Sequence, residues 1–391
     1  MRHLVERTRR ILRDTPDTVC LERARLLTEA YQRHEGEPPP LRRALALRHV
    51  LRYMTLDLHT NPLFAGNVSS GPRRWMLLPE SGFQVPEQAV VEHPQLKGFL
   101  DGDVIPAELR AYWATRVTGA GIGHLGVNLY RVVHQGLESI LAEIEAHRGA
   151  DDPEAQTYRG AMAVACQAVM EWAERYAVAA ARAARSAVDP AERRALERVA
   201  GACAQVPAQP ARNLFEALQA VVLVHLALHL EGHGFSVSVG LPDRVLQPFL
   251  PEAANPDTVD LLAAFLLKLS ENSVWGSFSK TQAVTVGGAD ARGMDRSNAF
   301  TLAFLEASVV ANMPDPHLFL RWHENMDPRV KERAVELLAE GRSMPLLIGD
   351  RETVAGFVSA GIPPSDAWEY AVFGCNELGI PGKMVESAVG P

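Results

Sequence analysis

The chain has 391 residues, of which 47% are hydrophobic and 22% charged, and its formal net charge is −8. These proportions are typical of a globular protein and exclude a disordered tail, a fibrous chain and a small disulfide-stapled scaffold. The negative charge argues against a nucleic-acid-binding module, which needs a basic surface. A length of 391 residues is enough for one to three domains.

The four cysteines, Cys20, Cys166, Cys203 and Cys375, show no paired spacing. This scatter argues against a disulfide framework and a structural zinc site, and favours a reducing compartment. The basic start of the chain lacks the apolar core of a signal peptide. The longest apolar stretch, 217–230, is too short to span a membrane and contains Gln219, His225 and His229. We therefore expect a cytoplasmic protein without membrane or nucleic-acid partners.

Residues 1–234 are predicted to be mainly helical. Apolar residues recur at helical spacing opposite charged faces in the segments 22–33, 41–58, 127–147, 154–187 and 190–205. Pro207 and Pro210 interrupt the pattern, and 212–230 resumes it as a nearly all-apolar helix. We expect this last helix to be buried.

Residues 235–391 have a different pattern, in which short β-type runs alternate with helical stretches. The runs are 236–239, 283–286, 318–321, 346–348 and 370–373, and the helices between them are 259–270, 297–310, 329–340 and 352–360. Alternation of this kind predicts βαβ units in a parallel sheet or barrel. The predicted fold class is α/β, with a helical half packed around the start of a β/α core.

One segment of the sequence combines residue types that point to catalysis: Val372-Phe373-Gly374-Cys375-Asn376-Glu377. Cys375 follows a short predicted strand in a glycine-flanked loop, a place that presents a side chain to a cavity. Glu377, two residues on, could act as a general base beside the sulfur. The alternative is a buried cysteine without a chemical role, since free cysteines are commonly buried.

A metal site is a second hypothesis. His225, His229 and His233 are spaced i, i+4, i+8, as ligands on one helical face would be. There is no HExxH glutamate, and Gly232 and Gly234 indicate that the helix ends before His233. We expect core histidines with local hydrogen bonds and no bound metal, and keep a metal-dependent hydrolase using His225 and His229 as a rival.

Two glycine-rich segments are similar to nucleotide or ion loops. Residues 121–126 match GxGxxG, but the segment before them reads as helix, whereas a dinucleotide loop follows a strand. Residues 287–295 lack the Lys-Ser/Thr of a P-loop and the terminal glutamate of a calcium hand. We interpret them as a tight bend around His124 and a structured turn after a strand.

Several segments together carry a further pattern. They are ERARLLTEAYQRHEGEPPPLRRALALRHVL at 22–51, Gly123-His124 with Gly136-Leu137, ERYA at 174–177, the 207–219 stretch, SVSVGLPDRVLQPF at 236–249, Gly287-Gly288, 341–350 and GCNE at 374–377. In this order and spacing the set resembles the glycyl radical enzymes, the superfamily of pyruvate formate-lyase and the glycerol and diol dehydratases. The resemblance runs through nearly the whole chain.

This resemblance implies a helical N-terminal region packed on the first half of a ten-stranded β/α barrel. In such enzymes a glycyl radical, installed by a radical-SAM activase with an iron–sulfur cluster, converts an active-site cysteine to a thiyl radical that takes hydrogen from a small-molecule substrate. Cys375 matches that cysteine, and Glu377 matches the base that deprotonates the substrate hydroxyl. His124 and Ser236 match substrate-binding positions. No cofactor or metal would be bound directly by this chain.

The resemblance also indicates which of the reactions of this superfamily the residues favour. Pyruvate formate-lyase uses two adjacent cysteines, whereas Gly374 precedes Cys375 here. Glu377 therefore favours a dehydratase-like elimination over the alternative, a formate acetyltransferase-like C–C lyase. Asn376 stands where valine is usual, and Leu378-Gly379 fit no substrate class in particular.

The resemblance further implies that residues 1–391 form an incomplete pyruvate formate-lyase-like domain. The radical glycine belongs to a C-terminal RVxGY-like motif; Arg198–Ala202 imitate it, but Ala202 replaces the aromatic residue. We expect a truncated chain, inactive alone, that lacks the glycyl radical domain and needs the missing C-terminal half or a complementing chain. A homodimer is a further expected partner state. The rival from another class is a non-catalytic or split-enzyme subunit that binds a complementing chain.

Overall fold

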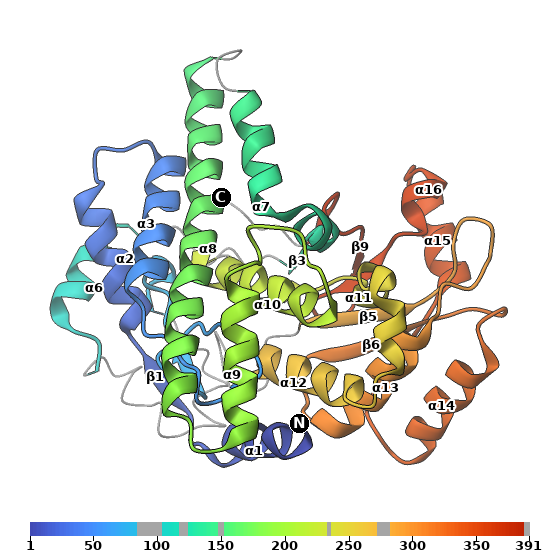
Figure 1. Cartoon of the computed structure of the whole chain (residues 1–391). Helices are drawn as coiled ribbons and strands as arrows, with labels where there is room; N and C mark the ends of the chain where they lie inside the picture. Colours follow the sequence, from blue (N-terminus) through green and yellow to red (C-terminus); the bar gives the residue numbers. More distant parts are fainter. Residues whose placement is uncertain (84–103, 117–123, 148–151, 233–235, 272–281, 387–391) are drawn as a thin grey trace.

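The structure is a computed structural model that describes residues 1–83, 104–116, 124–147, 152–232, 236–271 and 282–386. Figure 1 shows a layer of helices on one side of the molecule and the β/α units on the other. The two layers share a core, because one contiguous cluster of buried residues extends from Leu4 to Leu337. It includes residues of α1 (Arg2–Asp14), α8 (Pro153–Ser186), α10 (Leu214–Glu231), α12 (Thr258–Ser270) and α13 (Ala299–Ala311). The helical and β/α parts therefore depend on each other for burial of their apolar faces.

The helical layer comprises α1 (Arg2–Asp14), α2 (Glu22–Arg33), α3 (Pro39–Tyr53), α6 (Ala107–Trp113), α7 (Leu129–Ala146), α8 (Pro153–Ser186), α9 (Pro190–Cys203) and α10 (Leu214–Glu231). Helix α8 packs between α3 and α9. Asp-Pro pairs begin α8 and α9: the Asp152 carboxylate accepts a hydrogen bond from the Ala155 N–H, and Asp189 accepts one from Ala191. Both are N-caps with proline at the first helical position.

Two predicted helices differ from the observed ones. Helix α3 ends at Tyr53, five residues before the predicted end, because Arg175 on α8 donates to the carbonyls of Leu51 and Met54 and so satisfies the end of α3. Helix α7 is kinked at Gly136, whose φ is 77°. The 207–211 loop inserts there, with the Leu137 N–H donating to the Pro207 carbonyl at 2.8 Å.

Helix α10 is the buried helix that the apolar pattern predicts. The helix is longer than the 217–230 stretch judged too short to span a membrane. By length and composition it could cross a bilayer, but 83% of it is buried inside the protein. Asn213 caps its start and Gly232, with a φ of 106°, ends it. It contacts α3, α7, α8, α9, α12 and β4, which makes it the central helix of the core.

Helix α1 was not predicted. It docks on the β/α side, where Arg2 pairs with Asp260 of α12 at 2.7 Å and Arg9 donates to the Val310 carbonyl of α13 at 2.8 Å. Its apolar residues Leu4, Val5 and Leu12 are buried beneath it.

The β/α part follows the predicted alternation. Its elements are β4 (Ser236–Ser238), α11 (Pro242–Val245), η3 (Gln247–Ala254), α12 (Thr258–Ser270), β5 (Ala283–Gly287), α13 (Ala299–Ala311), β6 (His317–Trp322), α14 (Pro328–Ala339), β7 (Leu346–Gly349), α15 (Asp350–Ser359), α16 (Pro364–Ala367), β8 (Ala371–Phe373), β9 (Glu377–Gly379) and β10 (Val385–Glu386). All five predicted β-type runs form strands, and the four helices between them are present.

The strands form a parallel array in the order β3-β4-β5-β6-β7, where β3 is His124–Gly126. β3 pairs with β4, and β5, β6 and β7 pair with one another, all parallel. A parallel bridge between Gly240 and Val284 joins the two groups. The array thus draws its first strand from before residue 235. Outside this array, β10 is antiparallel to β3, β8 and β9 form an antiparallel pair, and β1 (Thr18–Cys20) is parallel to β2 (Arg74–Met76), which precedes η1 (Pro79–Ser81).

Candidate active site

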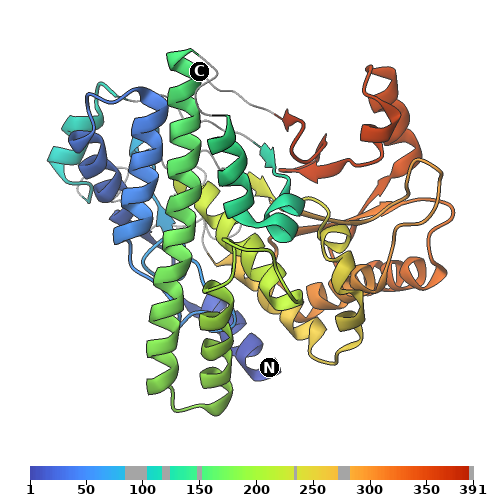
Figure 2. The same cartoon turned by 45° about the horizontal axis from the view of Figure 1, so that its top comes forward.

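The cysteine lies at the tip of a β-hairpin that packs against the parallel array. Strands β8 and β9 are antiparallel, with Phe373 opposite Glu377, and Cys375 sits exposed in the turn between them. Strand β8 contacts β3, β4 and β5. Figure 2 shows this red hairpin beside β3 and β4. Cys375 is thus exposed and not buried, and its role as a reactive side chain stays a prediction.

Two buried hydroxyls on the array hold the backbone of the hairpin. The Val372 N–H donates to Thr285 Oγ1 at 3.0 Å, and the Gly374 N–H donates to Ser238 Oγ at 3.2 Å. Ser238 also accepts the Ala283 N–H at 3.0 Å. These contacts fix the hairpin against β4 and β5, because a buried N–H needs an acceptor.

Glycines make this close approach feasible. The Phe373 ring lies against both Gly126 and Gly379. A Cβ added at Gly126 would lie 2.0 Å from this ring, and one added at Gly379 would lie 2.4 Å from it. Gly374 has a φ of 54°, and a Cβ there would lie 2.1 Å from His124 Nδ1. The glycine before the cysteine therefore provides both a left-handed turn and room for the histidine.

His124 and Glu377 meet beside the cysteine turn. His124 Nδ1 lies 3.0 Å from Glu377 Oε1, with the His124 side chain 8% exposed and that of Glu377 29%. Burial alone would raise the pKa of Glu377, but the N–H groups of Glu377 and Asn376 and the neighbouring His124 outweigh it and hold that pKa below its ordinary value. Glu377 is therefore an ionised carboxylate that can accept a proton.

Ser236 joins the same face. It is the register partner of His124 on the adjacent strand, and it is fully buried. Side chains of partner residues point to one face of a sheet, and residues two apart on a strand do so as well. Ser236 thus shares its face with His124 and with Ser238, which contacts the hairpin. The structure gathers the four residues that the sequence singled out, Cys375, Glu377, His124 and Ser236, at one place.

The other cysteines have different environments. Cys20 and Cys203 are buried, and Cys166 on α8 is partly buried. Burial raises the pKa of the Cys166 and Cys203 thiols. None of them neighbours Cys375 in sequence, so no adjacent pair is available for acyl transfer.

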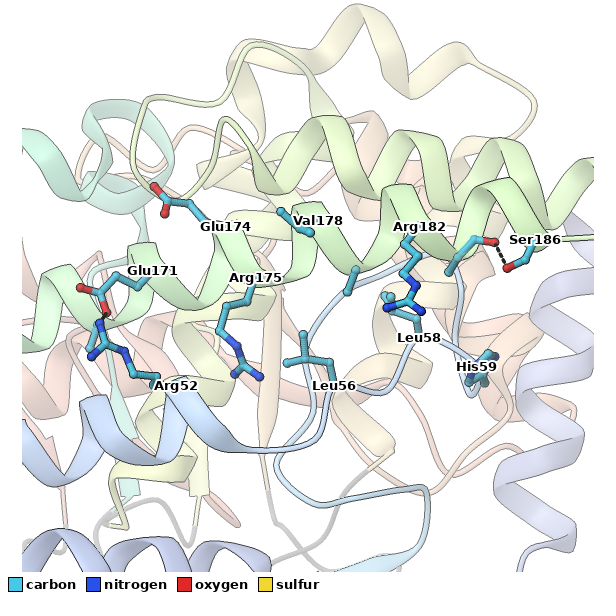
Figure 3. Close-up of a pocket in the computed structure, with 13 residues that line it drawn as sticks. Arg52, Leu56, Leu58, His59, Glu171, Glu174, Arg175, Val178, Arg182 and Ser186 are labelled. Carbon is cyan, nitrogen blue, oxygen red and sulfur yellow. Dashed lines mark hydrogen bonds and ion pairs between the residues drawn. The ribbon is translucent and has the colours of Figure 1, made fainter.

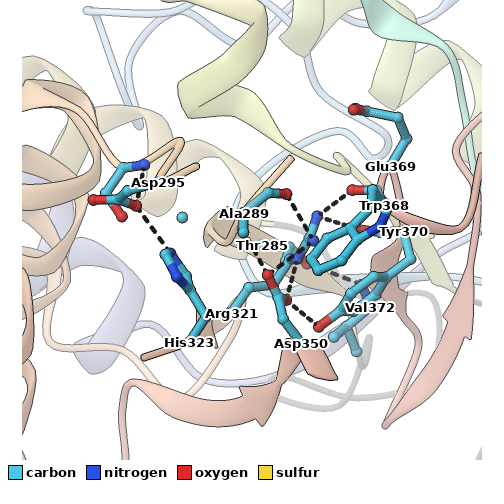
Figure 4. Close-up of polar contacts among 12 residues, drawn as sticks. Thr285, Ala289, Asp295, Arg321, His323, Asp350, Trp368, Glu369, Tyr370 and Val372 are labelled. Atoms are coloured by element: carbon cyan, nitrogen blue, oxygen red, sulfur yellow. Dashed lines mark hydrogen bonds and ion pairs between the residues drawn. The ribbon is translucent and has the colours of Figure 1, made fainter. Parts of the chain in front are cut away.

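A buried polar cluster that the sequence reasoning missed anchors the base of the hairpin (Figure 4). Arg321 on β6 donates to Asp350 through Nε at 2.8 Å and through Nη2 at 3.2 Å. Its Nη1 donates to the carbonyls of Trp368 and Tyr370, each at 3.0 Å, immediately before β8. The Tyr370 hydroxyl donates to Asp350 at 2.7 Å, and burial raises the pKa of Tyr370 so that it remains a donor.

Arg244 supports the same segment from α11. It pairs with Glu369 at 2.8 Å and donates to the Ala289 carbonyl at 3.2 Å.

One signal in the sequence could have revealed the buried polar cluster: Arg321 is a charged residue inside the mostly apolar strand His317–Trp322. A fully buried charge of this kind needs a partner on a neighbouring element.

The alternative sites are resolved as follows. His225 contacts the Val237 carbonyl through Nε2 at 2.8 Å, and its ring packs on His229. No group of three metal-ligating side chains exists among the described residues, and His233 lies outside them. The core interpretation of His225 and His229 is confirmed.

The glycine-rich segments are structural where they are described. Residues 124–126 form β3, whereas Gly121 and Gly123 lie outside the described residues. The 287–295 segment is a turn, in which Asp290 accepts the N–H groups of Arg292 and Met294 at 2.9 and 3.0 Å. The string that imitates a radical-glycine motif lies in α9.

A surface cavity of about 920 Å³ runs along α8 (Figure 3). Arg175 and Arg182 point from α8 toward the 54–60 loop, where Leu58 and His59 lie. None of the four predicted site residues lines it. The chemistry of the cysteine hairpin is therefore separate from this cavity.

Comparison with known proteins finds relatives over nearly the whole chain. The chain is 30% identical to the probable dehydratase YbiW of Escherichia coli, over 93% of this chain and 52% of that protein. It is 25% identical to the (2S)-3-sulfopropanediol dehydratase of Klebsiella oxytoca, over 97% of this chain and 53% of that protein. The chain thus spans about half the length of the curated relatives it matches.

Solved structures show the same fold. The glycerol-bound B12-independent glycerol dehydratase from Clostridium butyricum superposes with a TM-score of 0.86 at 25% identity, over 97% of this chain and 55% of that one. A glycyl radical enzyme from Archaeoglobus fulgidus superposes with a TM-score of 0.85 at 26% identity, over 96% and 55%. The pyruvate formate lyase-like family model matches residues 3–390. The chain therefore belongs to the pyruvate formate lyase-like family, within the glycyl radical enzyme superfamily.

Proposed function

We propose that the chain is the cysteine-bearing part of a glycyl radical lyase that eliminates water, or a comparable leaving group, from a small hydroxylated substrate. The observation that carries the proposal is the contact of Glu377 with His124 beside the exposed Cys375. The known relatives include dehydratases and sulfite-lyases.

Each residue has a role in this proposal. The Cys375 thiyl radical takes a hydrogen atom from a substrate carbon, so that an S–H bond forms and a C–H bond breaks. Glu377 accepts the proton of the hydroxyl on that carbon. His124 and Ser236 hold the substrate by hydrogen bonds while the neighbouring C–O bond breaks. The proton that Glu377 accepted is transferred to the departing hydroxyl, which leaves as water. Cys375 then returns its hydrogen atom to the product radical, which restores the thiyl.

The radical itself would come from a partner segment. Because the chain spans about half of its relatives, we propose that a glycine outside residues 1–391 carries the stored radical and that a radical-SAM activase installs it. The chain alone is then inactive. Cytoplasmic location and a homodimer remain predictions attached to this proposal.

The rival reactions receive less support. A formate acetyltransferase-like C–C lyase needs a second cysteine beside the first, and Gly374 occupies that position. A non-catalytic subunit would have no use for an ionised carboxylate beside an exposed thiol. The metal-dependent hydrolase has no ligand set in the described part of the chain.

The experiment combines the chain anaerobically with a C-terminal glycyl radical segment from a dehydratase relative and its activase. We expect a glycyl radical signal by electron paramagnetic resonance, and an aldehyde product from a vicinal diol such as glycerol. Glu377→Gln is expected to keep the radical and lose the product. A radical signal with Glu377→Gln turning over at the wild-type rate contradicts the role of Glu377, and a complex that binds but never forms the radical favours the non-catalytic subunit.

A further inference from the structure

A second cavity, of about 430 Å³, lies at the opposite end of the strands from the cysteine tip. Its lining follows the carboxyl ends of β3 and β4 and the end of β9, and Arg296 joins it from the loop after β5. Parallel α/β folds bind small ligands at the carboxyl ends of their strands. The position of this cavity is therefore the one at which the fold most readily forms a binding site.

The lining combines an apolar floor with a cationic rim. Val239, Leu241 and Ile380 supply apolar surface. Arg244, Arg296 and Lys383 supply three positive charges, and Glu369 supplies one negative charge. Such a combination of apolar surface and a few directed polar groups is typical of a small-molecule site.

The three positive charges differ in how far they are satisfied: Lys383 pairs with Asp366 at 2.6 Å and Arg244 pairs with Glu369 at 2.8 Å, which makes Arg296 the least satisfied of them. Within the described residues, the Arg296 guanidinium has one polar side-chain contact, Nη2 to Gln247 Oε1 at 3.5 Å. Arg244 is only 9% exposed, and its Nε–H is buried with no acceptor among the described residues. Burial and the neighbouring Arg321 lower the pKa of Arg244, so an additional anion nearby would offset both effects.

We propose that this cavity, which we call the strand-end pocket, binds a small organic carboxylate. Its carboxylate would accept hydrogen bonds from Arg296, since a guanidinium matches the geometry of a carboxylate, and the positive charge of the buried Arg244 would attract it. Its apolar body would lie on Val239, Leu241 and Ile380. This site goes beyond the proposed elimination reaction, because Cys375, Glu377, His124 and Ser236 do not line it.

The experiment titrates benzoate into the purified 391-residue chain by isothermal calorimetry. Two probes separate charge from apolar contact: benzamide is the neutral isostere, and sulfate is an anion without an apolar body. We expect benzoate to bind at least about tenfold more tightly than either probe, because each probe loses either a charge-assisted hydrogen bond or the apolar contact. Benzamide binding as well as benzoate would overturn the requirement for an anion, and sulfate binding as well as benzoate would overturn the organic carboxylate.

Matched variants place the binding in the pocket. Arg296→Gln is expected to weaken benzoate binding about tenfold or more. Arg292→Gln is the control, because Arg292 belongs to the same loop, its side chain is 83% exposed, it pairs with Asp290 and it does not line the pocket. Equal affinity for the two variants would overturn the site.

A second variant keeps the test decisive if Arg296→Gln lowers the thermal midpoint. Lys383 has a 58% exposed side chain and lines the pocket from the end of β9. Lys383→Gln is expected to fold normally and to weaken benzoate binding severalfold, by loss of one attractive charge. Unchanged binding in Lys383→Gln together with unchanged binding in Arg296→Gln would locate the benzoate elsewhere.

Discussion

Replacing Arg321 by glutamine is expected to destabilise the fold by about 4 kcal/mol. The Arg321 side chain is 0% exposed and that of Asp350 is 1% exposed, so the pair is shielded from water. Breaking a buried pair by removing one partner leaves an uncompensated charge, which costs about 3–5 kcal/mol.

The structure places the expected value inside this range. After the substitution Asp350 keeps two donors, the Tyr370 hydroxyl at 2.7 Å and the Ala289 N–H at 2.6 Å, which limits the cost of the remaining charge. The carbonyls of Trp368 and Tyr370 lose a charged donor, which adds to the cost. Since the whole stability of a domain is about 5–15 kcal/mol, the effect is a large fraction of it.

Urea unfolding followed by circular dichroism measures the change through the midpoint and the slope. Arg329→Gln on α14 is the control, because its side chain is 77% exposed and it pairs with Asp327 at the surface. That control is expected to leave the midpoint unchanged.

A double-mutant cycle separates the pair from general damage. Arg321→Gln and Asp350→Asn together are expected to cost less than the sum of the two single changes by about 2 kcal/mol, because the double variant buries no unpaired charge. A single Arg321→Gln variant within about 1 kcal/mol of the wild type would refute the reasoning, since a buried unpaired carboxylate cannot be that inexpensive.

Further substitutions probe the hairpin and the elements packed against it, with Gly160→Ala in α8 as a contrast. Ser238→Ala is expected to destabilise the fold by about 1–3 kcal/mol, because two buried N–H groups lose their acceptor. It is also expected to speed alkylation of Cys375, which mass spectrometry measures. Alkylation at the wild-type rate would mean that the Ser238 hydroxyl does not hold the turn. Gly126→Ala is expected to lower the stability of the fold by about 1–3 kcal/mol, because the added methyl group overpacks against Phe373. Gly160→Ala in α8 has open space at its Cβ and is expected to raise the stability by about 0.5–1 kcal/mol. Thermal midpoints of the two variants that move in the same direction would contradict this contrast. Because the folded-state pKa of Glu377 lies below its ordinary value, Glu377 stabilises the fold above its unfolded pKa, and this contribution disappears as the pH falls through the folded pKa. In a ¹³C NMR titration, His124→Gln is expected to raise the pKa of Glu377, and an unchanged pKa would show that the pair does not affect the carboxylate.

The sequence predicts the repetitive elements well because their signals are local. The apolar period of 259–270 and the β-branched run of 283–286 specify α12 and β5 without reference to the rest of the chain. Cys375 and Glu377 could be singled out in the same way, since they stand in one short motif, and their roles stay predictions.

The contacts that position the site were not predictable in the same way. Strand β3 has three residues, and its strand conformation depends on pairing with β4 and β10, both distant in the sequence. The Arg321 cluster joins β6, α15 and the segment before β8, so no local pattern encodes it. Only the buried charge itself, inside an apolar strand, indicates that a partner must exist.

The most direct test of the account is the turnover of Cys375→Ala in the activated anaerobic complex, measured beside its glycyl radical yield. The account predicts a radical yield equal to that of the wild type and no elimination product, because the stored radical would then have no sulfur through which to reach the substrate. Product formation at the wild-type rate in Cys375→Ala would contradict it.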